Sequence, residues 1–210
     1  DESHACRELW RIIRNEDISL EYRDRAAEKL EQVAERGDAH AQYRMGQLYR
    51  DGPLLIPDNH KAKHWLSQAA IQGLPEAQYA LGKLLLSDDW ELRDPDEGIR
   101  WLKQAAENGS HFAAYRLGKE YLEGNTVSKA TTRAADWFAK SAEAGNQYAQ
   151  YMLGKLYLMG QGLPRDQANA MVWFSRSAAQ GNQYAQFFLE QRNNFRPPSV
   201  MLAVTQLLYH

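Results

Sequence analysis

Residues 145–157, GNQYAQYMLGKLY, decide the fold because their pattern recurs along the chain at one fixed spacing. A step of 36 residues toward the N-terminus gives GSHFAAYRLGKEY at 109–121, then GLPEAQYALGKLL at 73–85 and GDAHAQYRMGQLY at 37–49. One step forward gives GNQYAQFFLEQRN at 181–193. A period that holds over five copies without drift is typical of repeat arrays, in which function is a property of the array.

Each copy predicts two amphipathic helices, near 39–50 and 59–72 in the first complete copy. Apolar residues recur there at intervals of three and four, which is the helical period. A glycine ends each copy and is expected in the left-handed conformation that closes a helix. These glycines are Gly37, Gly73, Gly109, Gly145 and Gly181. The sequence therefore predicts an all-α solenoid of 36-residue helix-turn-helix repeats.

The array divides into three parts. Residues 1–36 form a degenerate N-terminal repeat, in which Trp10 stands where later copies have glycine. Residues 37–180 form four complete repeats, and 181–210 form a half repeat followed by a C-terminal capping helix at 200–210. Because the chain begins with aspartate rather than methionine, we expect a piece of a longer or processed protein.

Two kinds of column are expected to build the core. Glycines inside the first helix face an equally small residue in the second helix, so that the two backbones approach closely. These pairs are Gly46 and Ala62, Gly82 and Gly98, Gly118 and Ala134, and Gly154 and Ala170. A second column is Trp65, Trp101, Trp137 and Trp173, beside Leu66, Leu102, Phe138 and Phe174. For the mutation Trp137→Ala we predict a cost of roughly 3–5 kcal/mol, the range for large core aromatics.

Composition excludes several function classes. The net charge of −2 gives no general attraction to nucleic acid or to an anionic membrane. The single cysteine, Cys6, fits a reducing compartment, so we expect a cytoplasmic, monomeric protein. His60 and His64 lie four residues apart, but the text HKAKH lacks the glutamate of a metalloprotease helix. We therefore expect no catalytic, cofactor or metal site.

The recurring text resembles the Sel-one-like repeat (SLR) family, which is related to the tetratricopeptide repeats. Ala-Gln-Tyr-x-Leu-Gly-x-x-Tyr is followed by Gly-x-Gly-x-Pro-x-Asp and Ala-x-x-Trp-Phe-x-x-Ser-Ala-x-x-Gly, most fully in 145–180. The resemblance covers about 37–195 and implies a right-handed α-α superhelix that binds other proteins without catalysis. The second copy departs from it, because DDWELRD replaces the glycine-rich loop.

A shorter resemblance concerns the C-terminal tail. Residues 196–199, RPPS, and the apolar text after them are similar to the region behind the repeats in some bacterial mobilisation relaxases. That likeness implies an alternative function, an accessory domain that positions or recruits a DNA-transfer machinery.

The candidate partner-binding surface is the first helix of each repeat, which lines the concave face in tetratricopeptide-like arrays. The predicted residues are Tyr43, Tyr79, Tyr115, Tyr151 and Phe187, with Lys83, Lys119, Lys155, Phe112 and Tyr148 beside them. Tyrosines offer flat contact area and a hydroxyl, and lysines favour an acidic segment of another protein or of another domain of the parent chain. Two other interpretations remain: packing between neighbouring helices, and base stacking on a nucleic acid, against which the charge stands.

Overall fold

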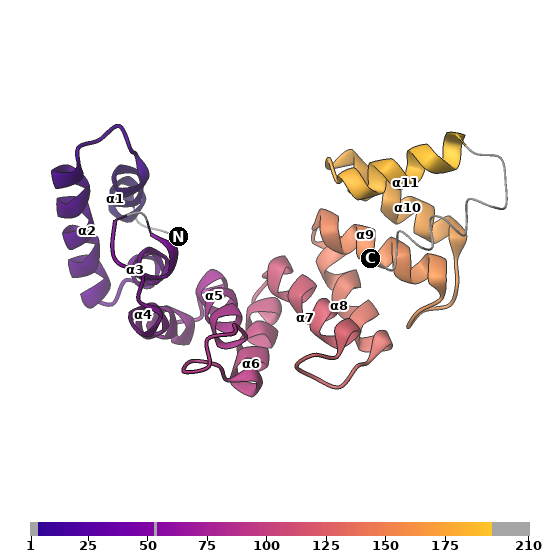
Figure 1. Cartoon of the computed structure of the whole chain (residues 1–210), viewed down its shortest axis with the longest axis horizontal. Coiled ribbons are helices and arrows are strands. Elements are labelled where there is room, and N and C mark those ends of the chain that lie inside the picture. Colours follow the sequence, from indigo (N-terminus) through magenta and orange to yellow (C-terminus); the bar gives the residue numbers. More distant parts are fainter. Residues whose placement is uncertain (1–3, 53, 195–210) are drawn as a thin grey trace. The chain divides into compact units, whose positions relative to one another are not determined.

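The computed structural model describes residues 4–52 and 54–194, and every regular element in those residues is a helix (Figure 1). The helices are α1 (His4–Arg14), α2 (Leu20–Glu35), α3 (Ala39–Asp51), α4 (Asn59–Ile71), α5 (Pro75–Leu85), α6 (Pro95–Glu107), α7 (His111–Glu123), α8 (Thr131–Glu143), α9 (Gln147–Met159), α10 (Gln167–Ala179) and α11 (Gln183–Asn194). The predicted all-α fold of helix-turn-helix repeats is confirmed. The predicted capping helix at 200–210 lies outside the described residues.

The chain forms two compact units, residues 1–110 and 111–210. In the first unit α1 to α6 pack consecutively, each helix on the next, and in the second unit α7 to α11 do the same. We call the first helix of each repeat helix A (α3, α5, α7, α9 and α11) and the second helix B (α4, α6, α8 and α10). Consecutive stacking within each unit buries the apolar face of a helix against its neighbours in sequence.

Glycine and aspartate set the helix ends. The five glycines that close the repeats have φ between +89° and +97°, as predicted. After each of them the next backbone N–H reaches back five residues, as from Asn146 to the Ser141 carbonyl at 3.0 Å. Three of the four B helices, α4, α6 and α10, begin after an aspartate whose carboxylate accepts a backbone N–H, as Asp166 does from Asn169 at 3.0 Å. The repeat boundaries thus follow from local chemistry.

The ends of the A helices differ between repeats. Gly160 ends α9 in the left-handed conformation, with φ 67°, whereas Gly52 ends α3 with an extended backbone at φ −71°. Helix α5 ends at Leu85, so Asp88 does not take the place of the closing glycine. The loop that follows α5 therefore has its own structure.

The core column is Leu66, Leu102, Phe138 and Phe174, each of which is fully buried. These side chains cover the helix-A glycines closely. A Cβ added at Gly118 would lie 2.7 Å from ring carbons of Phe138, and one at Gly82 would lie 3.0 Å from the Gly98 carbonyl oxygen. The predicted approach to a small residue of helix B is confirmed for Gly82 and for Gly154, where an added Cβ would lie 3.2 Å from the Ala170 carbonyl oxygen. This close packing explains why glycine recurs inside a helix despite its propensity cost of about 1 kcal/mol.

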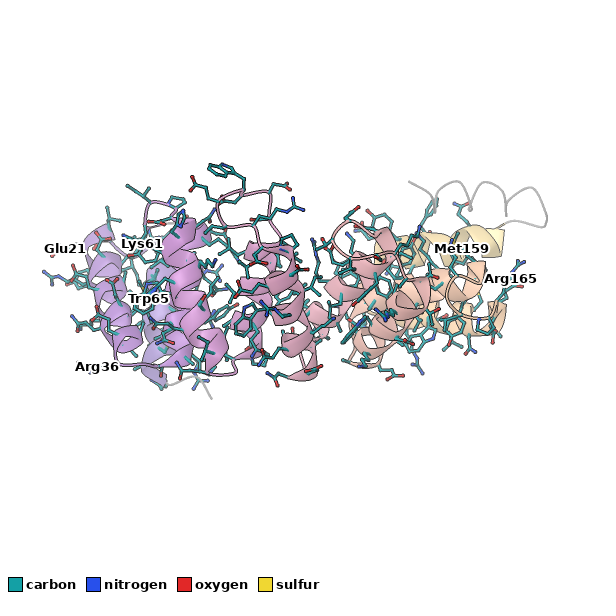
Figure 2. The ribbon with its side chains drawn as sticks, turned by 90° about the horizontal axis from the view of Figure 1, so that it is seen from below. Glu21, Arg36, Lys61, Trp65, Met159 and Arg165 are labelled. Atoms are coloured by element: carbon teal, nitrogen blue, oxygen red, sulfur yellow. The ribbon has the colours of Figure 1, made fainter. Side chains whose placement is uncertain are left out.

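The predicted tryptophan column packs against the core, but only one of its four members is buried. Trp65 is buried with Leu30 and Ala34 of α2, and Figure 2 shows it on α4 one turn from Lys61. Trp101, Trp137 and Trp173 are half-buried. The Lys140 ammonium lies 4.4 Å from the Trp137 ring centroid, so this face is reached by a solvated side chain. The mutation Trp137→Ala therefore costs less than the 3–5 kcal/mol expected for a fully buried ring.

A buried glutamine joins successive helix pairs. Gln150 of α9 donates to the Ala142 carbonyl of α8 at 3.1 Å and accepts from Gln180 at 2.8 Å. Gln42 and Gln78 make the same backward bond, to Ala34 and Ala70. The third complete repeat has alanine at this position, Ala114. The glutamine of the recurrent Ala-Gln-Tyr text is thus a structural residue.

Candidate functional site

The tyrosine column of the second unit lies on helix A between core and surface. Tyr115 and Tyr151 are half-buried, with ring centroids 5.8 Å from Phe138 and 5.7 Å from Phe174 respectively. Each tyrosine also meets the next helix A, because Tyr115 lies 6.2 Å from Tyr148 and Tyr151 lies 5.9 Å from Tyr184. The structure therefore brings the predicted column of Tyr115 and Tyr151 into contact with a second aromatic column, Tyr148 and Tyr184, on α9 and α11.

The outer members of these columns are strongly exposed. The exposed fraction is 52% for Phe112, 50% for Tyr148, 70% for Tyr184 and 46% for Phe187. We call these four residues, with Tyr115 and Tyr151, the aromatic face of the second unit. A group of exposed aromatic side chains on adjacent helices is typical of a surface that binds another molecule. The two predicted roles of the tyrosines, packing and contact, are both compatible with this half-buried state.

The lysine column accompanies the aromatic face. The Lys155 ammonium lies 5.8 Å from the Tyr151 ring centroid, and Lys119 pairs with Glu123 at 3.5 Å. Burial lowers the pKa of Lys155, because removal of water disfavours the ammonium. Burial likewise raises the pKa of the Tyr151 hydroxyl, to which the nearby Tyr184 adds. Lys155 therefore lies at the edge of a partly dry region, where a negative partner gains more than in open water.

A hollow of about 210 Å³ adjoins Lys155 in the second unit. Its lining also includes Lys129, Thr131 and Gln161, together with Met152 and Met159 of α9. The hollow thus combines apolar side chains with two lysines, a hydroxyl and an amide. Such a lining suits an acidic side chain with an aliphatic stem.

The first unit repeats this arrangement around Lys83. A hollow of about 300 Å³ is lined there by Arg50, Asp51, Asn59, Lys83, Leu84 and Ser87. Lys83 and Leu84 lie 72 residues before Lys155 and Leu156, so the two hollows occupy equivalent places in their repeats. The Lys83 ammonium also lies 5.6 Å from the Tyr79 ring centroid.

Tyr43 has a more enclosed environment than the other column members. Its hydroxyl accepts a 2.9 Å bond from Gln47, and the Arg44 guanidinium lies 5.6 Å from its ring centroid. Burial raises the pKa of the Tyr43 hydroxyl, and Arg44 opposes that shift. The Tyr43 ring and hydroxyl thus both have contacts within α3.

Sequence reasoning identified both columns but missed the hollows. Lys129 lies in a loop of variable text, where no recurring pattern distinguishes it.

The described residues contain no group of three His, Cys, Asp or Glu side chains that could hold a metal ion. None of the helices in that part of the chain is long and apolar enough to cross a membrane. His60 and His64 are exposed, as predicted.

Comparison with known proteins identifies the repeats. The Sel1 repeat family model matches residues 39–74, 75–110, 111–146 and 147–182. The structure is similar to that of a protective antigen of uropathogenic Escherichia coli with an SLR fold, at 33% identity and a TM-score of 0.74 over 80% of this chain. It is also similar to a Sel1 repeat protein from Oxalobacter formigenes, at 31% identity and a TM-score of 0.71 over 78% of this chain.

A more distant neighbour shares the fold. The immunity protein PA5088 from Pseudomonas aeruginosa matches over 95% of this chain and 74% of its own, at 21% identity and a TM-score of 0.60. The chain spans 37% of the Escherichia coli antigen and 65% of the Oxalobacter protein. No curated protein matches the chain.

Proposed function

Because the chain belongs to the Sel1 repeat family, we propose that it is a non-catalytic scaffold that binds an acidic segment of another protein along helix A. Sel1 repeat proteins generally act in protein interactions, which supports the class of function. One observation carries the finer proposal: Lys155, which lines the hollow on α9, lies 5.8 Å from the ring centroid of Tyr151, and Tyr151 in turn meets the exposed Tyr184. The immunity-protein neighbour, although distant, is compatible with a protein partner.

The chemistry of the surface favours an acidic, partly apolar segment. Tyr148 and Tyr184 present ring faces and hydroxyls, which contact a peptide backbone at low entropic cost. Lys129 and Lys155 line one hollow, where a partner carboxylate would relieve the burial cost of the Lys155 ammonium. Since the ammonium is already partly dehydrated, less water has to be removed when the ion pair forms.

The test uses labelled peptides that differ only in charge. A fluorescein-labelled peptide of alternating glutamate and leucine is titrated with the chain, beside matched peptides with lysine or glutamine in place of glutamate. We expect measurable binding of the acidic peptide only, weakened at least about tenfold by Tyr151→Ala or Lys155→Met, as for a central interface residue. Far-UV circular dichroism checks that each variant remains folded.

Matched controls separate the site from general adhesion. Tyr22→Ala removes a tyrosine that is 64% exposed on α2, and Lys29→Met removes a lysine of the same helix. Both variants should bind the acidic peptide as the parent chain does. Equal losses in the control and the site variants, or no binding of the acidic peptide, would refute the proposed surface.

The relaxase alternative receives no further support. The tail residues that carried the resemblance lie outside the described residues. Neither the Sel1 family match nor the solved structures named above point to a mobilisation protein.

A further inference from the structure

The loop between α5 and α6 exposes a tryptophan that the helix-A site does not use. Trp90 is 82% exposed, within the text DDWELRD that replaces the glycine-rich loop of the other repeats. Large aromatic side chains are costly to leave in water, and an exposed one is typical of a contact residue. The loop therefore requires an explanation beyond the connection of two helices.

Local hydrogen bonds hold this loop in one conformation. The backbone N–H groups of Leu92 and Arg93 donate to the Asp89 carbonyl at 3.1 and 2.8 Å, and the Asp94 N–H donates to the Leu85 carbonyl at 3.0 Å. The Leu92 side chain is 5% exposed and belongs to the core cluster of the first unit. Trp90 thus projects from a short turn that is fixed at both ends.

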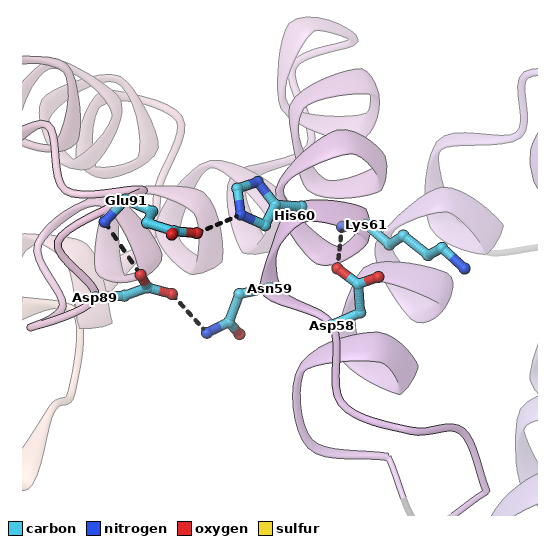
Figure 3. A network of polar contacts seen from close by, with 6 residues as sticks. All are labelled: Asp58, Asn59, His60, Lys61, Asp89 and Glu91. Atoms are coloured by element: carbon cyan, nitrogen blue, oxygen red, sulfur yellow. Dashed lines mark hydrogen bonds and ion pairs between the residues drawn. The ribbon is translucent and has the colours of Figure 1, made fainter.

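The start of α4 supports the same loop from the side. Figure 3 shows Asn59 donating to the Asp89 carboxylate at 2.9 Å, and His60 beside the Glu91 carboxylate at 3.1 Å. The Asp89 carboxylate also accepts the Glu91 backbone N–H at 3.3 Å. These contacts join the start of α4 to a loop about 30 residues further along the sequence. A preorganised loop of this kind loses little conformational entropy when a partner binds.

The charge around Trp90 is strongly negative. Residues 88–97 contain the carboxylates Asp88, Asp89, Glu91, Asp94, Asp96 and Glu97, against the single cation Arg93. Asp88, Glu91 and Asp96 are exposed. The face of an indole ring attracts cations, and neighbouring carboxylates strengthen that attraction.

From this arrangement we propose that the Trp90 loop binds an arginine-containing segment of a partner protein. An arginine guanidinium stacks on an aromatic face and also pairs with a carboxylate in a fork, whereas a lysine ammonium acts as a point charge. Trp90 supplies the ring, and the exposed acids nearest to it in the sequence, Asp88 and Glu91, supply the carboxylates. This surface is separate in residues and in preferred charge from the helix-A site proposed above.

The test titrates the chain into a fluorescein-labelled peptide of repeated arginine, glycine and serine. Matched peptides carry lysine or glutamate in place of each arginine. We expect binding in the order arginine, lysine, glutamate, weakening as salt is added because exposed charges are screened. Trp90→Ala should weaken binding at least about tenfold, as loss of a central aromatic contact does. Because the side chain is exposed, the variant should keep the parent melting curve.

A charge-matched pair of variants distinguishes the loop from general acidity. Asp88→Asn with Glu91→Gln should weaken binding, whereas Glu16→Gln with Asp17→Asn, exposed acids before α2, should leave it unchanged. The Tyr151→Ala variant should also bind the arginine peptide normally, which separates this proposal from the helix-A function. The proposal is overturned if Trp90→Ala binds as tightly as the parent chain, if the Glu16 and Asp17 variant loses as much affinity, or if the arginine peptide does not bind.

Discussion

The close contact between Gly118 and Phe138 gives the sharpest test of the packing. A Cβ at Gly118 would lie 2.7 Å from two ring carbons of Phe138 and 2.9 Å from a third. Carbon atoms prefer a separation of about 3.5–4.0 Å, so Gly118→Ala requires the ring to move by roughly 1 Å. Phe138 is fully buried and packs on Tyr115, so the ring has little room to move.

The expected free energies follow from two opposing terms. Overpacking costs about 1–3 kcal/mol, and replacement of a helical glycine by alanine returns about 1 kcal/mol. Gly118→Ala should therefore destabilise the chain by about 0–2 kcal/mol, and Phe138→Ala by about 3–5 kcal/mol. With the ring removed the clash disappears, so Gly118→Ala should then stabilise the chain by about 1 kcal/mol.

A double-mutant cycle measures the coupling between the two residues. Urea unfolding of the four proteins, followed by circular dichroism, should give a coupling free energy of about 1–3 kcal/mol. The equivalent cycle at Gly154 and Phe174 should give a smaller value, because an added Cβ there also meets the Ala170 carbonyl oxygen at 3.2 Å. Additive effects within about 0.5 kcal/mol at Gly118 and Phe138 would refute the proposed contact.

Other predictions follow from departures within the repeats. Ala130 precedes α8 with φ −147° and ψ 88° and no side-chain cap, so Ala130→Asp should raise the unfolding free energy by about 0.5–2 kcal/mol in urea titrations. Glu120 is 3% exposed, and one of its carboxylate oxygens has no hydrogen-bond partner, although Arg116 pairs with the other. Because a buried ion pair has a high desolvation cost, the double variant Glu120→Leu with Arg116→Met should have a higher urea midpoint than the parent chain, and a lower midpoint would contradict this. Gln150→Ala should cost about 1–3 kcal/mol by calorimetry, because the buried groups it bonds lose their partner. Burial lowers the pKa of Lys155 in the folded chain, so the charged lysine destabilises the fold below that pKa, and this destabilisation fades as pH rises toward the unfolded pKa. Lys155→Met should therefore have a higher unfolding free energy than the parent at pH 7, and the difference should shrink in alkaline solution. A difference that does not change with pH would exclude this cause.

The sequence could predict the repeat framework because its determinants are local. A glycine after each helix B and an aspartate before three of the four act within a few residues, so their spacing is visible in the sequence. The small residues inside helix A were equally visible, since Gly118 and Gly154 recur at the same place in each copy. Boundaries of helices therefore agreed with the structure to within a residue or two.

The candidate surfaces could be predicted only in part because their exposure depends on neighbouring helices. Periodicity places Trp137 and Phe138 on similar faces of α8, but only the packing shows that Phe138 is buried and Trp137 half-exposed. Lys129 reaches the hollow at Lys155 from another loop, and no spacing rule relates those two residues. Non-local geometry of this kind is absent from a one-dimensional pattern.

The recurrent text of α9 separates residues that hold the fold from residues that are available to a partner. Ala149 and Leu153 are buried, Gln150 bonds the preceding helix pair, and Gly154 admits the Phe174 ring. Each of these has a complete structural role. Tyr151 is different, because one side of its ring packs on Phe174 while it remains half-buried beside Tyr184. Phe187, at the equivalent place on α11, shows that the column accepts a ring without a hydroxyl. The proposed contact with a partner would give the phenolic oxygen of Tyr151 a role that ring packing alone does not require.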